Sequence, residues 1–177
     1  MLRLRPYRKE DAGEIVTWIK DEVTFRKWSA NLFEKYPIGE KDLQEHYENA
    51  KKNMPNRFFP MTAYDETGIV GHLFFRFPDE DRKVVRFGYV IVNDQKRGQG
   101  YGKEMIRAAI DYAYSEFRVD KVSLGVFENN PAAYYCYKAA GFVDVAQEED
   151  TYYPIMGEQW KCLELEYKKQ EEGRYEV

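Results

Sequence analysis

The chain has 177 residues, a mass of 21.1 kDa and a formal net charge of −4. A chain of this length forms one domain of ordinary size and buries about 70% of its unfolded surface, so it needs no disulfide scaffold. Hydrophobic residues make up 44%, charged residues 33% and aromatic residues 16% of the sequence, which excludes a disordered or collagen-like chain. The sequence pI of about 5.4 argues against a dedicated binder of duplex DNA, so no nucleic-acid partner is expected.

The amino terminus and the two cysteines exclude further classes of protein. Residues 1–8 alternate apolar and basic side chains without the apolar core of a signal peptide, and no apolar run approaches the ~20 residues of a membrane span. We therefore expect a soluble, cytoplasmic protein with no membrane partner. Cys136 and Cys162 form no CxxC pair and have no histidine nearby, so we expect both to be packing residues and expect no metal site.

The first third of the chain mixes helical and irregular patterns. Alternating leucines and arginines in residues 2–5 predict a strand, and Asp11 is expected to cap a helix with Ile15 on its apolar face. Residues 20–39 are rich in aromatic side chains and are predicted to be irregular. A second helix is expected from about Glu40 to Asn53.

The remainder of the chain alternates strands and helices. Three extended runs joined by turn sequences predict an antiparallel meander, and apolar residues at spacings of three and four then predict a helix over residues 102–117. Two more strands are expected near the end. We predict an α+β fold with a mixed sheet in a single domain over residues 1–169, followed by a charged tail, residues 170–177. The elements expected in this part are strands Phe58 to Tyr64, Ile69 to Phe77, Lys83 to Val92, Lys121 to Phe127 and Trp160 to Lys168, and a helix from Pro131 to Ala139.

A glycine-rich loop lies between the third meander strand and the long helix. It reads Arg97-Gly98-Gln99-Gly100-Tyr101-Gly102-Lys103, and Lys96 precedes it. The first turn of a helix carries unpaired N–H groups and a partial positive charge, and glycines let an anion approach them closely. Three cations in an otherwise acidic chain strengthen this field. The loop therefore predicts a polyphosphate site.

Two common phosphate motifs do not fit this loop. A Walker A sequence ending at Lys103 would need glycine in place of Arg97 and serine or threonine in place of Glu104. A dinucleotide fingerprint starting at Gly98 would need glycine in place of Lys103, and Asp120 precedes a strand instead of ending one. A tight turn without any ligand remains the alternative interpretation.

The loop and a second motif together resemble the GNAT superfamily of acetyl-CoA-dependent N-acetyltransferases. The acetyl-CoA loop of that family follows the pattern Q/R-x-x-G-x-G/A, which Arg97, Gly100 and Gly102 match. The later family motif is matched by Asn130, Ala133, Tyr137 and Gly141-Phe142. Within the family, Gly88-Tyr89-Val90-Ile91 and Glu104 resemble the branch related to ribosomal-protein N-terminal acetyltransferases.

The resemblance implies a fold and a set of functional residues. It implies a largely antiparallel sheet of about seven strands that splays at a central parallel pair, with helices on both faces. The backbone of Val90, Ile91 and Val92 would pair with the pantetheine arm of acetyl-CoA, and the amides of Gly98, Gln99, Gly100, Tyr101, Gly102 and Lys103 would hold the pyrophosphate. Asn130 would contact the arm, and Tyr137 would be the general acid that protonates the departing thiolate.

The expected chemistry is direct attack of a neutral amine on the thioester, with a backbone N–H of residues 90–92 stabilising the oxyanion. A tyrosine titrates near 10 and a thiol near 8.5, so full proton transfer from Tyr137 is uphill by about 2 kcal/mol unless a helix N-terminus or a cation lowers its pKa. The two strand carboxylates of some relatives are replaced here by Arg86 and Gly125. The remaining candidates for a base are a chain of water and the acids Asp21, Glu22, Glu149 and Asp150.

Several questions stay open at this level. A weak base favours an acceptor with an α-amine, because about one α-amine in ten is neutral at pH 7. The acceptor is expected to be a small-molecule amine or a protein N-terminus, and a sheet edge or the exposed aromatic residues allow pairing into a homodimer. His46 and His72 are interpreted as structural residues. A sensor of acyl-CoA without turnover and a nucleotide-binding regulator are the competing functions.

Overall fold

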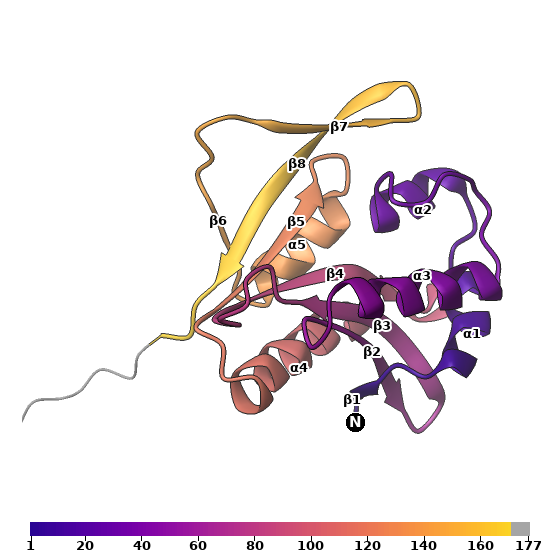
Figure 1. Ribbon diagram of the computed structural model, residues 1–177, viewed down its shortest axis with the longest axis horizontal. Coiled ribbons are helices and arrows are strands. Elements are labelled where there is room, and N and C mark those ends of the chain that lie inside the picture. The colour runs from indigo at the N-terminus through magenta and orange to yellow at the C-terminus, as the bar shows by residue number, and fades with distance from the viewer. Residues whose placement is uncertain (171–177) are drawn as a thin grey trace, which may run out of the picture.

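The computed structural model describes residues 1–170, which form one eight-stranded mixed sheet with five α-helices (Figure 1). The strand order is β1-β2-β3-β4-β5-β8-β6, and β7 pairs with β8 as a hairpin. All neighbouring strands are antiparallel except β4 and β5, which are parallel. The strands are β1 (Arg3–Pro6), β2 (Phe58–Asp65), β3 (Gly68–Arg76), β4 (Val84–Val92), β5 (Lys121–Phe127), β6 (Val143–Asp144), β7 (Thr151–Ile155) and β8 (Glu158–Tyr167).

Helices cover both faces of the sheet, as predicted. One face carries α4 and α5 over an apolar core that includes Phe75, Met105 and Leu165. The other carries α1, α2 and α3 over an aromatic core that includes Phe25 and Tyr89. The helices are α1 (Ala12–Thr17), α2 (Glu22–Ser29), α3 (Glu40–Asn53), α4 (Tyr101–Glu116) and α5 (Pro131–Ala139), with short 3-10 turns at Lys9–Asp11 and Asp94–Lys96.

Two predictions for the N-terminal part are wrong. Residues 20–39 are not irregular throughout, because α2 occupies Glu22–Ser29 and is capped by Asp21, whose carboxylate accepts a 2.7 Å hydrogen bond from the Thr24 amide. Asp11 stands at the N-cap position of α1, but its side chain forms no cap hydrogen bond with that helix. Its carboxylate instead accepts hydrogen bonds of 2.8 Å from Arg5 and from the Thr62 hydroxyl, and thereby ties β1 and β2 to the first helix.

The remaining predicted elements are confirmed, with small changes. Helices α3 and α5 and strand β5 have the predicted bounds, and α4 is displaced by one residue. The C-terminal part has three strands instead of two, because the residues before Trp160 fold into the β7–β8 hairpin. None of the helices in residues 1–170 is long and apolar enough to span a membrane. The predicted charged tail, apart from Gln170, lies outside the described residues.

The buried pair His72 and Tyr47 makes stability depend on pH. His72 is fully buried on β3, its Nε2 atom is hydrogen-bonded to the Tyr47 hydroxyl, and burial lowers the pKa of His72 from 6.5 to about 3. The unfolded chain therefore binds more protons than the native chain between these values, and stability is lost as the pH falls through that window.

We expect the free energy of unfolding to fall by about 1.6 kcal/mol between pH 6.5 and pH 5, because the slope rises toward 1.36 kcal/mol per pH unit only below the pKa of the unfolded histidine. Urea unfolding at the two pH values measures this loss. The variant His72→Gln should show a clearly flatter dependence, and an equal slope in both proteins would assign the effect to other groups.

Candidate functional site

A wedge opens between the two parallel strands. Only Val84, Val85 and Arg86 of β4 pair with β5, opposite residues 121–123. Beyond this point the strands diverge, and Figure 1 shows β5 and β8 rising away from β4. The predicted splay is confirmed. Residues 87–92 therefore leave backbone groups on one edge of β4 without a strand partner, which is a ready surface for an extended ligand.

A β-bulge lies in the splayed part of β4. His72 pairs with Ile91 and Phe74 pairs with Gly88, so β4 has one residue more than β3 between these two pairs. Tyr89 lies in the bulge with φ +51°, which is unusual for a residue with a side chain. The extra residue changes which face each side chain occupies: Phe87 packs in the α4 core and Tyr89 in the aromatic core. The bulge thus redirects the backbone groups of residues 89–92.

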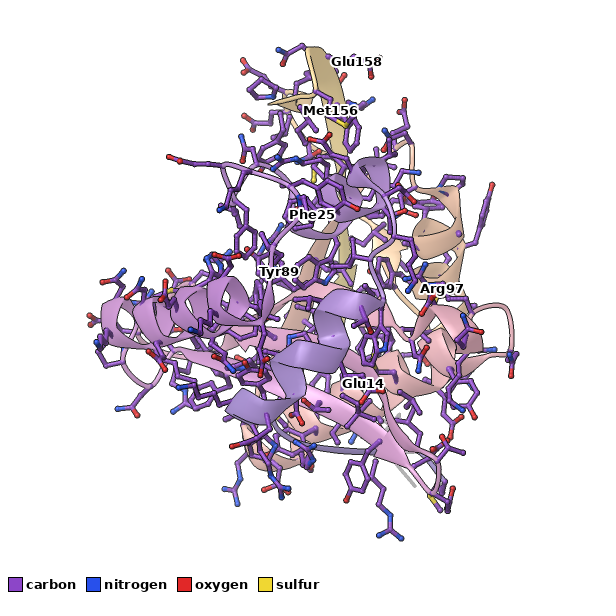
Figure 2. All side chains as sticks on the ribbon, turned by 90° about the vertical axis from the view of Figure 1, so that its right-hand side faces the viewer. Glu14, Phe25, Tyr89, Arg97, Met156 and Glu158 are labelled. Atoms are coloured by element: carbon purple, nitrogen blue, oxygen red, sulfur yellow. The ribbon has the colours of Figure 1, made fainter. Side chains whose placement is uncertain are left out.

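Trp28 of α2 holds this bulge in place. Its indole N–H donates a 2.8 Å hydrogen bond to the carbonyl oxygen of Tyr89, and the two rings lie 4.7 Å apart. Figure 2 shows Tyr89 below Phe25 of the same helix. The bond is buried, so the Tyr89 carbonyl has no replacement donor from solvent.

We expect Trp28→Phe to lower the free energy of unfolding by about 1–3 kcal/mol, because a buried carbonyl loses its donor. Urea unfolding measures the change. Trp160→Phe is the matched control, since the Trp160 indole donates to the partly exposed carboxylate of Glu158, which water can solvate. Equal losses of unfolding free energy in the two variants would show that the buried hydrogen bond to the Tyr89 carbonyl contributes no more to stability than the bond to Glu158.

The glycine loop leads directly into α4, as predicted. Gly98 has φ +75° and Gly100, the residue before the helix, has φ +86°. A Cβ atom at either position would have no atom within 4 Å, so both glycines border open space. No side chain caps the helix start, which leaves the first amides of α4 free to bind an anion.

The cations around the loop have different roles. The Arg97 guanidinium donates to the carbonyl oxygens of Val92 at 3.2 Å and Trp18 at 3.0 Å, so it ties α1 to the end of β4 (Figure 2). In this chain, Arg97 therefore also fixes the geometry of the loop. The Lys96 ammonium lies 5.0 Å from the centre of the Tyr101 ring.

The predicted residues of the second motif lie on α5. Asn130 is the N-cap of this helix, and its side-chain oxygen accepts a hydrogen bond of 3.5 Å from the Ala133 amide. Gly102 of α4 faces the same helix, because a Cβ atom there would lie 3.2 Å from the Cys136 sulfur. Cys136 is half-buried, and burial raises the pKa of its thiol. Cys136 therefore stays protonated and serves as a packing residue.

Tyr137 is almost completely buried in the core beneath α4, with 6% of its surface exposed. Burial raises its pKa above the ordinary value of 10. Burial is the largest cause of this rise, and no cation within residues 1–170 is among the causes that act on the Tyr137 pKa. The Tyr137 hydroxyl is therefore protonated at neutral pH.

Three of the four acids predicted as candidate bases have a hydrogen-bond or ion-pair partner, and the fourth lies in an exposed loop. Asp21 caps α2, and hydrogen bonds from Thr24 lower its pKa. Glu22 lies 3.6 Å from Arg26, and Asp150 lies 3.5 Å from Lys161. Glu149 is exposed in the loop before β7.

Sequence reasoning missed a carboxylate that lies at the wedge itself. Glu164 of β8 pairs opposite Gly125 and forms a bidentate ion pair with Arg86 of β4, with one oxygen 2.9 Å from Nη2. The alternation of residues 160–168 indicates which residues share a face. It does not indicate the register with β5, which only the folded sheet provides.

The two histidines have structural partners, in agreement with their interpretation. The Nε2 atom of His46 lies 2.9 Å from the Tyr89 hydroxyl, and burial lowers the pKa of His46. His72 lies deeper, beside Tyr47. Within residues 1–170, no group of three or more potential metal ligands is present.

Comparison with solved structures supports the same fold. A spermidine N-acetyltransferase from Vibrio cholerae, solved in complex with CoA and spermine, superposes with a TM-score of 0.75 at 21% identity. The superposition covers 94% of this chain and 95% of that one. At this identity the likeness establishes the fold.

Sequence comparisons find relatives that are more similar in sequence but match over a shorter part of the chain. A spermine/spermidine N(1)-acetyltransferase of Bacillus subtilis (strain 168) is 32% identical over 88 residues, which are 47% of this chain and 58% of that protein. A spermidine N(1)-acetyltransferase of Vibrio cholerae is 31% identical over 55 residues, 31% of this chain and 32% of that protein. The chain thus spans little more than half the length of the first of these curated relatives, and neither supports the resemblance to the ribosomal-protein branch.

The family description "Acetyltransferase (GNAT) domain" matches residues 1–143, which include the wedge, the glycine loop and α5. The match extends over most of the chain and agrees with the splayed parallel pair and the uncapped start of α4. The chain belongs to the GNAT acetyltransferase family.

Proposed function

We propose that the chain transfers an acetyl group from acetyl-CoA to a primary amine. The observation that carries this proposal is the wedge between β4 and β5, which lies beside the glycine loop at the start of α4. The residues present fit the cofactor, because Gly98 and Gly100 border open space next to unpaired amides. A bound acetyl-CoA would supply the activated thioester.

The chain would bind and orient the reactants. The free backbone edge of residues 90–92 would pair with the pantetheine arm, and the amides of residues 98–103 would hold the pyrophosphate. The amine nitrogen attacks the thioester carbonyl carbon, the C–S bond breaks, and the sulfur takes the bonding electron pair. An amide near the bulge would stabilise the oxyanion, Tyr137 would give the thiolate a proton, and water would remove one from the amine.

We propose a polyamine as the acceptor in preference to a protein N-terminus. Relatives of the chain are named as acetyltransferases of spermine and spermidine. A hollow of about 260 Å³ lies where β5 meets the β7–β8 hairpin. Its lining includes the carboxylates of Glu128 and Glu158, the rings of Tyr152 and Trp160, and Lys161, whose ammonium lies 3.8 Å from Glu128. Carboxylates and aromatic faces both attract organic cations.

The test is a screen for CoA release from acetyl-CoA with polyamines, N-terminal peptides and aminoglycosides as acceptors. We expect turnover with spermidine or spermine well above that with the other amines. Turnover with peptides alone would contradict the polyamine proposal. Binding of acetyl-CoA without turnover on any amine would favour the sensor of acyl-CoA, and stronger thermal stabilisation by ATP than by CoA would favour the nucleotide-binding regulator.

A further inference from the structure

The ion pair of Arg86 and Glu164 lies at the point where the wedge opens. Arg86 is the last residue of β4 that pairs with β5, opposite Ser123. Glu164 comes from β8, on the far side of β5. The guanidinium bridges the gap, because it contacts both carboxylate oxygens of Glu164 and lies 3.2 Å from the Ser123 hydroxyl.

Gly125 of β5 provides the space for this pair. A Cβ atom at Gly125 would lie 3.1 Å from Nη2 of Arg86 and 3.8 Å from Oε2 of Glu164. The absence of a side chain therefore lets the charged groups pass over the backbone of β5. The carboxylate of Glu164 on a third strand, β8, therefore lies beside positions 86 and 125.

The pair is on the face of the sheet opposite α4 and α5. Val85 and Phe87, the neighbours of Arg86 in sequence, point into the core beneath α4, so Arg86 points to the other face. The glycine loop starts α4, so an acceptor that approaches from the face of Arg86 would meet the wedge from the side away from that helix. Side chains of Arg86 and Glu164 are 27% and 22% exposed, which leaves them accessible to a ligand.

We propose that the Arg86–Glu164 pair is the subsite that receives the acceptor amine, with the Glu164 carboxylate accepting a hydrogen bond from it. This inference rests on the proposed acetyl transfer. Each carboxylate oxygen has two lone pairs, so Glu164 retains acceptor capacity after binding Arg86. Arg86 acts as a positioning residue that holds the carboxylate above Gly125.

The second contribution of Arg86 is electrostatic. The attacking amine must be neutral, and a carboxylate alone would favour the ammonium form. The adjacent guanidinium opposes that preference, and Arg76, the cross-strand neighbour of Arg86 on β3, adds a further positive charge. The subsite can therefore orient an amine without holding it as an ammonium ion. Glu164 is assigned an orienting role, and the proton passes to water.

The test compares Glu164→Gln with the matched control Glu166→Gln. Both glutamates lie on β8 with their side chains on the same face, and Glu166 has its own ion pair with Lys121 at 3.3 Å. Their side-chain exposures are 22% and 23%. Glu166, however, faces Ser123, where β4 and β5 are still paired.

We expect Glu164→Gln to lower kcat/KM for spermidine by about 30-fold or more, with the KM for acetyl-CoA unchanged, because a charge-assisted hydrogen bond is lost. Glu166→Gln should stay within about threefold of the wild type. Equal effects of the two substitutions would overturn the proposal.

The double variant Arg86→Gln with Glu164→Gln separates amine binding from a purely structural role. Two neutral amides can hydrogen-bond to each other, so the unfolding midpoint should return toward that of the wild type. We expect kcat/KM for spermidine to stay low. Recovery of activity together with stability would show that the pair is only structural. If the wild-type chain releases no CoA with spermidine, the polyamine function itself fails, which is a different outcome.

Discussion

The variant Tyr137→Phe is expected to lower kcat by about 100-fold or more while leaving the affinity for acetyl-CoA nearly unchanged. The ring would keep its place in the core, because Tyr137 contacts α4 and Phe142 through its apolar surface. Only the hydroxyl group, with the proton it can donate, is lost. Steady-state kinetics with spermidine and calorimetric binding of acetyl-CoA measure the two quantities.

The raised pKa of Tyr137 determines how much of its proton can be transferred to the thiolate. A buried tyrosine with a pKa above 10 keeps its proton throughout the neutral range, so the acid is available, but full transfer to a thiolate costs more than the ~2 kcal/mol of an unperturbed tyrosine. We therefore expect the proton to be shared at the transition state. Tyr135→Phe is the control, since Tyr135 is on the same helix and 68% exposed. Similar kcat values for the two variants would remove the general-acid role.

The variant Gly100→Ala should weaken the binding of acetyl-CoA by about tenfold or more. At φ +86° a side chain is strained by about 1–2 kcal/mol, and the new methyl group would extend into the open space beside the α4 amides. Isothermal calorimetry measures the dissociation constant.

A matched glycine separates this loss from backbone strain. Gly157, in the β7–β8 hairpin turn, has φ +76° and also borders open space. Gly157→Ala should reduce stability by a similar amount and leave the dissociation constant unchanged. Parallel losses of affinity in the two variants would show that strain alone explains the result.

The sequence predicts best what depends on local patterns. The apolar spacing in α4, the proline at the start of α5 and the alternation in β5 define these elements within one residue of their ends. Gly98 and Gly100 both have positive φ values, which explains why the loop needs glycine at these positions, while the anion site at the loop stays a prediction. Helix α2 was missed because its buried Phe25 and Trp28 stand among irregularly spaced aromatic residues, and its cap Asp21 lies in a run of charges.

Contacts between distant segments could not be predicted from one sequence. Trp28 and Tyr89 are 61 residues apart, and Arg86 and Glu164 are 78 apart. Both contacts depend on strand register and on a one-residue bulge, which no local pattern encodes. Arg97 has a role that its charge alone does not indicate, because its guanidinium donates to two backbone carbonyl oxygens, while its contact with the cofactor stays a prediction.

Amide hydrogen exchange with and without acetyl-CoA tests most directly whether the splayed strand and the glycine loop form the cofactor site. We expect slower exchange within residues 90–92 and 98–103, because amides on the unpaired edge of β4 and at the start of α4 would bind the pantetheine arm and the pyrophosphate, with no change in the β7–β8 turn. Protection confined to other segments, or equal protection of these residues by ATP, would contradict the account.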